Sequence, residues 1–177
     1  MNQNLASNLT STAQAHGHSP ALRLGETVLS YAELDDASAR VAGLLRERGL
    51  EPGDRVGIML PNVPQFAVAY YGVLRAGGVV VPMNVLLKER EVAFYLGDPE
   101  VKLVFAWHEF AQAAEHGAAQ AGSECVLVAL GECRGGSASQ ARSVPRSRGF
   151  RCASSTISAG RWRRARPARS RSAATTS

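Results

Sequence analysis

Cysteines and long apolar runs are scarce in this sequence, and each shortage excludes a class of protein. The cysteines, Cys125, Cys133 and Cys152, are odd in number and show no CxxC spacing. This pattern argues against a disulfide framework or a zinc site and agrees with a reducing compartment. The polar N-terminus lacks the features of a secretory signal, and no apolar run is long enough to span a membrane. We therefore expect a soluble, cytoplasmic protein.

Acidic residues are missing altogether from the last part of the chain. Residues 1–132 hold nine Lys and Arg against fifteen Asp and Glu, a net charge of −6, whereas residues 133–177 hold eleven Arg and no acid, a net charge of +11. The second segment is rich in Arg, Ser and Ala and has few large apolar residues, too few to offset chain entropy. We divide the chain into a folded part, 1–132, and a basic tail, 133–177, which we expect to be disordered.

The most strongly patterned stretch is residues 53–84. It contains a short apolar run, then apolar residues at helical spacing between Pro64 and the pair Gly77-Gly78, then a valine run closed by Pro82. Proline suits the first helical turn and glycine the end of a helix. These signals predict a strand, a helix and a second buried strand, with the two strands parallel, over residues 55–60, 65–75 and 79–81.

The remaining elements alternate in the same way. Ser30 followed by Glu33 is a capping box and starts a helix that runs to about Arg48. Apolar runs and helical periodicity predict a weak helix over 2–16, a hairpin over 21–29, helices over 88–96 and 108–120, and buried strands over 101–105 and 125–130. This order predicts an α/β fold with a mostly parallel sheet flanked by helices.

Several residues of reactive type have a simpler structural interpretation. Gly77-Gly78 precedes a strand rather than a helix, so it does not fit a phosphate loop. The histidine pairs lack a third ligand or the spacing of a zinc helix, and a cysteine that starts a buried strand is an inert thiol. We therefore assign no catalytic, cofactor-binding or metal-binding role to these residues, which are His16, His18, His108, His116 and Cys125.

Three motifs in order carry a resemblance to a known family. They are LSYAEL at 29–34, GDRVGIMLPN at 53–62 and LRAGGVVVPMN at 74–84. Together they resemble the N-terminal signatures of the adenylate-forming (AMP-binding) superfamily. The LLKERE segment at 86–91 is most similar to bacterial fatty-acyl-CoA synthetases. The resemblance covers about residues 5–132.

The resemblance implies a two-step reaction. A carboxylate, here a fatty acid, attacks the α-phosphate of ATP with Mg²⁺ present, giving an acyl-adenylate and pyrophosphate, and coenzyme A then displaces AMP to form a thioester. The family's phosphate loop has no counterpart here, since Arg134–Ser139 lacks its lysine and threonines, and neither Lys88 nor Lys102 stands where its catalytic lysine belongs. We therefore expect a truncated, inactive N-terminal part that by itself binds none of these cofactors.

The tail has two interpretations. Its composition is typical of GC-rich DNA read out of frame, which would explain why the family pattern ends before residue 133. Alternatively, its arginines around Trp162 form a nucleic-acid-binding arm, or a patch that adheres to acidic membranes, on a non-enzymatic interaction module. We expect the first of these.

Overall fold

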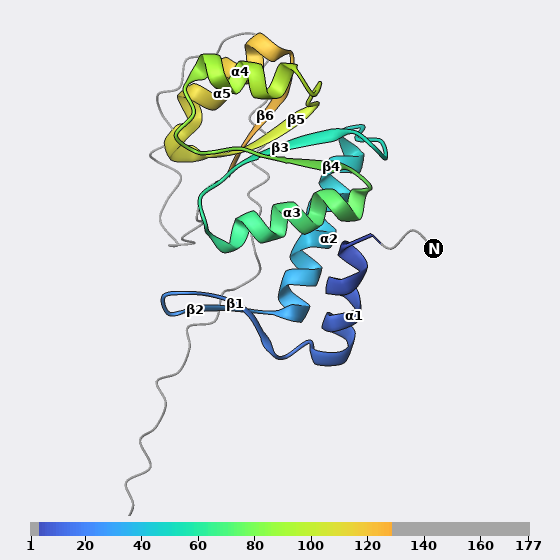
Figure 1. Ribbon diagram of the computed structural model, residues 1–177. Coiled ribbons are helices and arrows are strands. Elements are labelled where there is room, and N and C mark those ends of the chain that lie inside the picture. The colour runs from blue at the N-terminus through green and yellow to red at the C-terminus, as the bar shows by residue number, and fades with distance from the viewer. Residues whose placement is uncertain (1–3, 129–177) are drawn as a thin grey trace, which may run out of the picture.

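The computed structural model describes residues 4–128 (Figure 1). The N-terminal part comprises α1 (Ala6–His16), the antiparallel hairpin of β1 (Pro20–Leu24) and β2 (Thr27–Ser30), and the long helix α2 (Tyr31–Glu47). The predicted capping box is confirmed. Ser30 Oγ accepts a bond from the Glu33 N–H at 3.3 Å, and Glu33 Oε2 accepts one from the Ser30 N–H at 2.9 Å. The expectations for the basic tail lie outside the described residues.

A four-stranded parallel sheet forms the centre of the molecule. Its strands are β3 (Arg55–Met59), β4 (Val79–Pro82), β5 (Leu103–Trp107) and β6 (Glu124–Val128), in the order β4-β3-β5-β6. The connections are α3 (Pro64–Ala76), α4 (Glu89–Gly97) and, after the short 3-10 turn η1 (His108–Phe110), α5 (Ala111–Ala121). The predicted α/β fold with a mostly parallel sheet is confirmed.

Helices cover both faces of this sheet (Figure 1). On one face α2 and α3 pack over a core that includes Leu45, Ile58 and Val73. On the other face α4 and α5 pack over a separate core that includes Met59, Val92 and Leu96. All five residues of β5 are buried because both cores share this strand. No helix within residues 4–128 has the length and apolar character needed to cross a membrane.

The prediction that β4 is a buried strand is wrong. β4 lies at the edge of the sheet, and Val79 is 49% exposed. The N–H groups of Val79 and Met83 donate to Asp54 O and Ile58 O of the β3 segment at 2.7 and 2.9 Å. Peptide groups alternate in direction along a strand, so Val80 and Pro82 present theirs to the outside. Proline is tolerated at this position because it lacks only an outward N–H.

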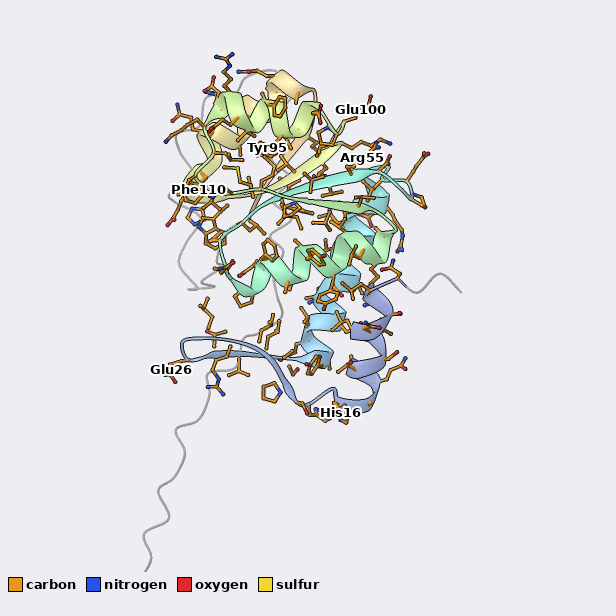
Figure 2. All side chains as sticks on the ribbon, in the orientation of Figure 1. His16, Glu26, Arg55, Tyr95, Glu100 and Phe110 are labelled. Carbon is orange, nitrogen blue, oxygen red and sulfur yellow. The ribbon has the colours of Figure 1, made fainter. Side chains whose placement is uncertain are left out.

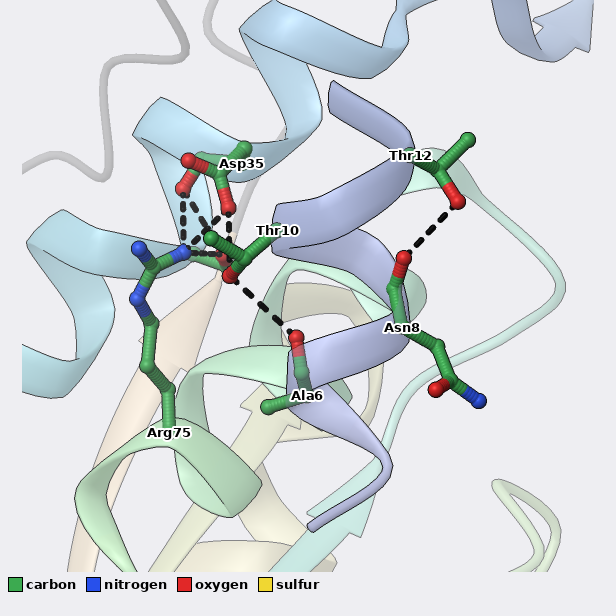
Figure 3. Close-up of polar contacts among 7 residues, drawn as sticks. Ala6, Asn8, Thr10, Thr12, Asp35 and Arg75 are labelled. Atoms are coloured by element: carbon green, nitrogen blue, oxygen red, sulfur yellow. Dashed lines mark hydrogen bonds and ion pairs between the residues drawn. The ribbon is translucent and has the colours of Figure 1, made fainter. Parts of the chain in front are cut away.

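A polar network joins the three N-terminal helices (Figure 3). Arg75 Nη1 of α3 donates to Asp35 Oδ1 at 2.5 Å, to Asp35 O at 3.1 Å and to Ser38 Oγ at 3.2 Å, all on α2. Thr10 of α1 donates to the same Asp35 carboxylate at 3.3 Å. Ser38 is fully buried, so the network satisfies its hydroxyl and fixes the helices to one another.

Candidate functional site

The carboxyl end of the parallel sheet is the position at which α/β folds bind ligands, in the crevice where the chain reverses its direction of winding. From β3 the chain moves to β4 through α3 on one face, and from β4 it crosses to β5 through α4 on the other face. The reversal therefore lies between β3 and β5. The segments that follow these strands are residues 60–63 and His108–Phe110.

A surface groove of about 580 Å³ opens beside this reversal. Its two walls are far apart in sequence, one being the loop that leads into α4 and the other the turn between β5 and α5. The first wall includes Leu86, which is 70% exposed, and the second includes the half-buried Phe110. Figure 2 shows Phe110 at this end of the sheet, opposite Arg55 and Glu100. The groove is lined by Val85, Leu86, Leu87, Lys88, Glu89, Arg90, Glu109, Phe110, Gln112 and Ala113.

Local hydrogen bonds give the first wall its shape. Asn84 Oδ1 accepts a bond from the Leu86 N–H at 2.9 Å, a turn in which the side chain replaces a backbone acceptor. Glu91 Oε2 accepts a bond from the Lys88 N–H at 2.8 Å and so caps α4. The first wall is also tied to α5, because Glu89 Oε2 lies 3.1 Å from His116 Nδ1. The groove is thus held by contacts between α4 and α5.

The charges of the groove do not favour one sign. Lys88 and Arg90 occur together with Glu89 and Glu109 among its lining residues, so the side chains that line it sum to no net charge. The groove can therefore hold a mostly apolar molecule, and its surface gives no specific preference for a phosphate.

The opposite end of the sheet is a belt of ion pairs. Lys102 Nζ lies 2.7 Å from Asp54 Oδ2, and Arg48 Nη1 lies 2.5 Å from Glu124 Oε1. The hydrogen bond from Lys102 lowers the pKa of Asp54 below its ordinary value and raises the pKa of Lys102. These groups are engaged with one another at the strand starts, so this end is structural.

The residues considered from sequence fall in separate places. Cys125 is buried in β6, and burial, followed by the charges of Glu115 and Glu124, raises its pKa to about 12. His16 and His108 are exposed at element ends, and within residues 4–128 no three metal-ligating side chains come together. Lys102 precedes β5 instead of lying on a strand, which corrects its predicted position. Sequence reasoning missed the groove because its walls are about twenty residues apart. Helical periodicity describes a single segment and does not show that two distant segments lie side by side.

The Gly77-Gly78 pair does not form a phosphate-binding loop. Gly77 has φ 89° and ends α3 as a left-handed cap, and a Cβ placed on it would lie 3.2 Å from Pro52 Cβ. This glycine serves a tight turn at the start of β4 and leaves no cradle for a phosphate. The two cations that line the groove, Lys88 and Arg90, share it with the carboxylates of Glu89 and Glu109.

The comparisons with known proteins decide the family. The sequence pattern of the family described as AMP-binding enzyme matches residues 9–170, which is most of the chain. The chain belongs to this family. The match runs past Glu132, where the residues that carry the resemblance end.

Curated relatives in the AMP-binding family include ligases for both fatty and aromatic acids. The chain is 38% identical over 103 residues to a long-chain-fatty-acid–CoA ligase of Bacillus subtilis, covering 58% of this chain and 18% of that protein. It is 36% identical over 131 residues to a feruloyl-CoA synthase of an Amycolatopsis species, covering 74% of this chain and 26% of that protein. The chain thus spans about a fifth to a quarter of the length of these relatives.

Solved structures of family members share the fold. A benzoate CoA ligase from Burkholderia xenovorans matches with a TM-score of 0.65 at 26% identity, covering 71% of this chain and 25% of that one. A Mycobacterium tuberculosis fatty acyl CoA synthetase matches with a TM-score of 0.61 at 27% identity, covering 71% of this chain and 26% of that one. These proteins are CoA ligases, and they give no support to a nucleic-acid-binding module.

Proposed function

We propose that this chain belongs to the machinery that joins a carboxylic acid to coenzyme A. In the first step a carboxylate oxygen attacks the α-phosphorus of ATP and pyrophosphate leaves. In the second step the CoA sulfur attacks the acyl carbon and AMP leaves. The observation that carries the proposal is the family match over residues 9–170, together with relatives that are fatty-acid and aromatic-acid CoA ligases.

Within that reaction we assign to residues 4–128 the role of a scaffold. The sheet carries its loops toward the end at which α/β folds bind ligands, and both of its cores are closed by helices. Stabilising the charge that develops on the phosphates requires donors and cations placed around them. The described residues provide no such cluster, so we propose that the 177-residue chain does not catalyse the reaction alone.

The substrate is proposed to be a fatty acid, in keeping with the fatty-acid ligases among the relatives. Exchange of labelled pyrophosphate into ATP, measured on the purified chain with fatty and aromatic acids, tests the scaffold proposal, and any exchange that it reveals tests the substrate proposal as well. We expect exchange no higher than that of buffer. Exchange above background would overturn the scaffold proposal, and a preference for aromatic acids would overturn the proposed substrate.

For residues 133–177 we retain the proposal of an out-of-frame reading, supported by their eleven arginines and lack of acids. The family match argues against an out-of-frame reading, because it extends through this segment to residue 170. Resequencing the coding DNA and translating its other two frames decides between them. If neither frame contains a Ser/Thr/Gly-rich loop followed by Pro-Lys-Gly, the proposal fails.

A further inference from the structure

The outer face of α4 carries an exposed aromatic side chain between two opposite charges. Phe94 is 67% exposed, whereas Val92 and Leu96 on the inner face are fully buried. Arg90 lies one turn before Phe94 and Asp98 one turn after it, and both are exposed. Residues four apart lie on one side of a helix, so Arg90, Phe94 and Asp98 form one stripe, about 12 Å long at 1.5 Å per residue.

Neither charge in this stripe is matched within residues 4–128. The ion pairs in this part of the chain involve other residues. Of the two carboxylates beside Arg90 in sequence, Glu89 faces His116 of α5 at 3.1 Å and Glu91 accepts a bond from the Lys88 N–H at 2.8 Å. Beside the stripe, Gly97 faces open space, so a second backbone can approach there. Tyr95 is 47% exposed on the same helix (Figure 2), edge-on to Phe94 with ring centroids 6.0 Å apart.

We propose that this stripe is an interface with a second copy of the chain. A two-fold axis beside Phe94 places the two α4 helices antiparallel. Phe94 then meets Phe94 of the partner subunit, and Arg90 meets Asp98 of the partner subunit at both ends. Rows of residues four apart interdigitate when helices cross at about 50°, the commonest packing class. The arrangement of plus, apolar and minus is self-complementary only in this antiparallel order.

The identity of the partner as a second copy follows from the order of the charges along the stripe. A two-fold interface presents the same patch on both subunits, so each charge must find its opposite at the symmetry-related position. Arg90 and Asp98 satisfy this condition because they are equally distant from Phe94 along the helix. One helix pair buries less area than a stable dimer needs, so the dimer is weak and its population rises with protein concentration.

Sedimentation of the full chain over a range of micromolar concentrations, at physiological salt, tests the interface. We expect a reversible monomer–dimer equilibrium in the natural chain. Phe94→Ser should remain monomeric, with unchanged thermal unfolding because Phe94 is outside both cores. Leu24→Ser is the matched control, since Leu24 is 42% exposed on the hairpin, far from α4 (Figure 1), and should leave the equilibrium unchanged.

Charge reversal separates this geometry from unspecific apolar association. Arg90→Asp alone and Asp98→Arg alone should each weaken the dimer about fivefold, because each puts like charges opposite one another. The double variant should recover the natural affinity. The proposal is overturned by a natural chain that stays monomeric or forms larger assemblies, by a Phe94→Ser variant that still dimerises, or by a double variant no tighter than the single ones.

Discussion

Gly72 of α3 lies directly against Val41 of α2. A Cβ placed on Gly72 would stand 2.5 Å from the Val41 Cβ and 3.2 Å from the Ser38 carbonyl oxygen. Real Cβ atoms do not approach so closely, so α2 and α3 can pack at this distance only because residue 72 is a glycine and has no side chain. A similar contact joins α5 to α4, where a Cβ on Gly117 would stand 2.6 Å from the Val92 Cβ.

The first prediction concerns Gly72→Ala. The added methyl must push α3 away from α2, and overpacking of this kind costs about 1–3 kcal/mol. Gly43→Ala is the matched control because it lies in α2 with nothing within 4 Å of its Cβ, and it should gain about 0.5–1 kcal/mol from helix propensity. Chemical denaturation measures both. Equal stability of the two variants would contradict the close helix contact.

The second prediction concerns Arg75. Its guanidinium donates to three acceptors on α2, and its side chain is 26% exposed. Arg75→Ala leaves the Asp35 carboxylate without its main partner, and we expect a loss of about 1–2 kcal/mol in the free energy of unfolding. Arg40→Ala, which removes an exposed pair with Asp36 one turn away, should cost no more than about 0.5 kcal/mol. A smaller loss for Arg75→Ala than for Arg40→Ala would refute the network's role.

The third prediction follows from the Asp54–Lys102 pair. Lys102 lowers the pKa of Asp54, so the stabilisation is present above the ordinary aspartate pKa of about 3.9 and is lost as pH falls through the lowered value. The pKa of Lys102 is raised, so on the alkaline side the stabilisation disappears as pH rises beyond the ordinary lysine pKa of about 10.4.

Thermal unfolding of Asp54→Asn against the natural chain measures this effect. The variant should melt lower between about pH 4 and pH 10, and the two curves should converge below that window. The difference should be small because the Lys102 side chain is 52% exposed. Glu26→Gln, an exposed change at the hairpin tip, should show no such window. A gap between Asp54→Asn and the natural chain that does not narrow as pH falls from 4 to 2 would contradict the assignment.

The fourth prediction concerns Cys125. Burial raises its pKa to about 12, so at pH 8 only about one thiol in 10⁴ is ionised, and the thiolate is the reactive form. In a Cys133→Ser/Cys152→Ser background, alkylation of the native protein should be slower than that of a free thiol by orders of magnitude. Urea should restore the ordinary rate. Rapid alkylation of the folded chain would show that the strand opens or that the thiol is accessible.

The sequence predicted most of the elements because their signals are local. The Ser30–Glu33 box, Pro64 at a helix start and Gly77 at a helix end each act within a single turn. Strand order is not local, and the edge position of β4 was therefore missed, although Pro82 was a sign of it. The groove was missed for the same reason, because it forms only when residues 85–90 and 109–113 are brought together by the crossover to β5.

Pro82 has a consequence for how the sheet can grow. Of the outward groups on β4, Val80 contributes one N–H, whereas Val80 and Pro82 both contribute carbonyl oxygens. An arriving strand would find acceptors in excess and a single donor, so a continuous ladder cannot form along this margin. The valine run can therefore remain at the surface without recruiting other chains edge to edge. The proline ring therefore closes the β4 edge of the sheet to further strand pairing, so the sheet can be extended only from its other edge.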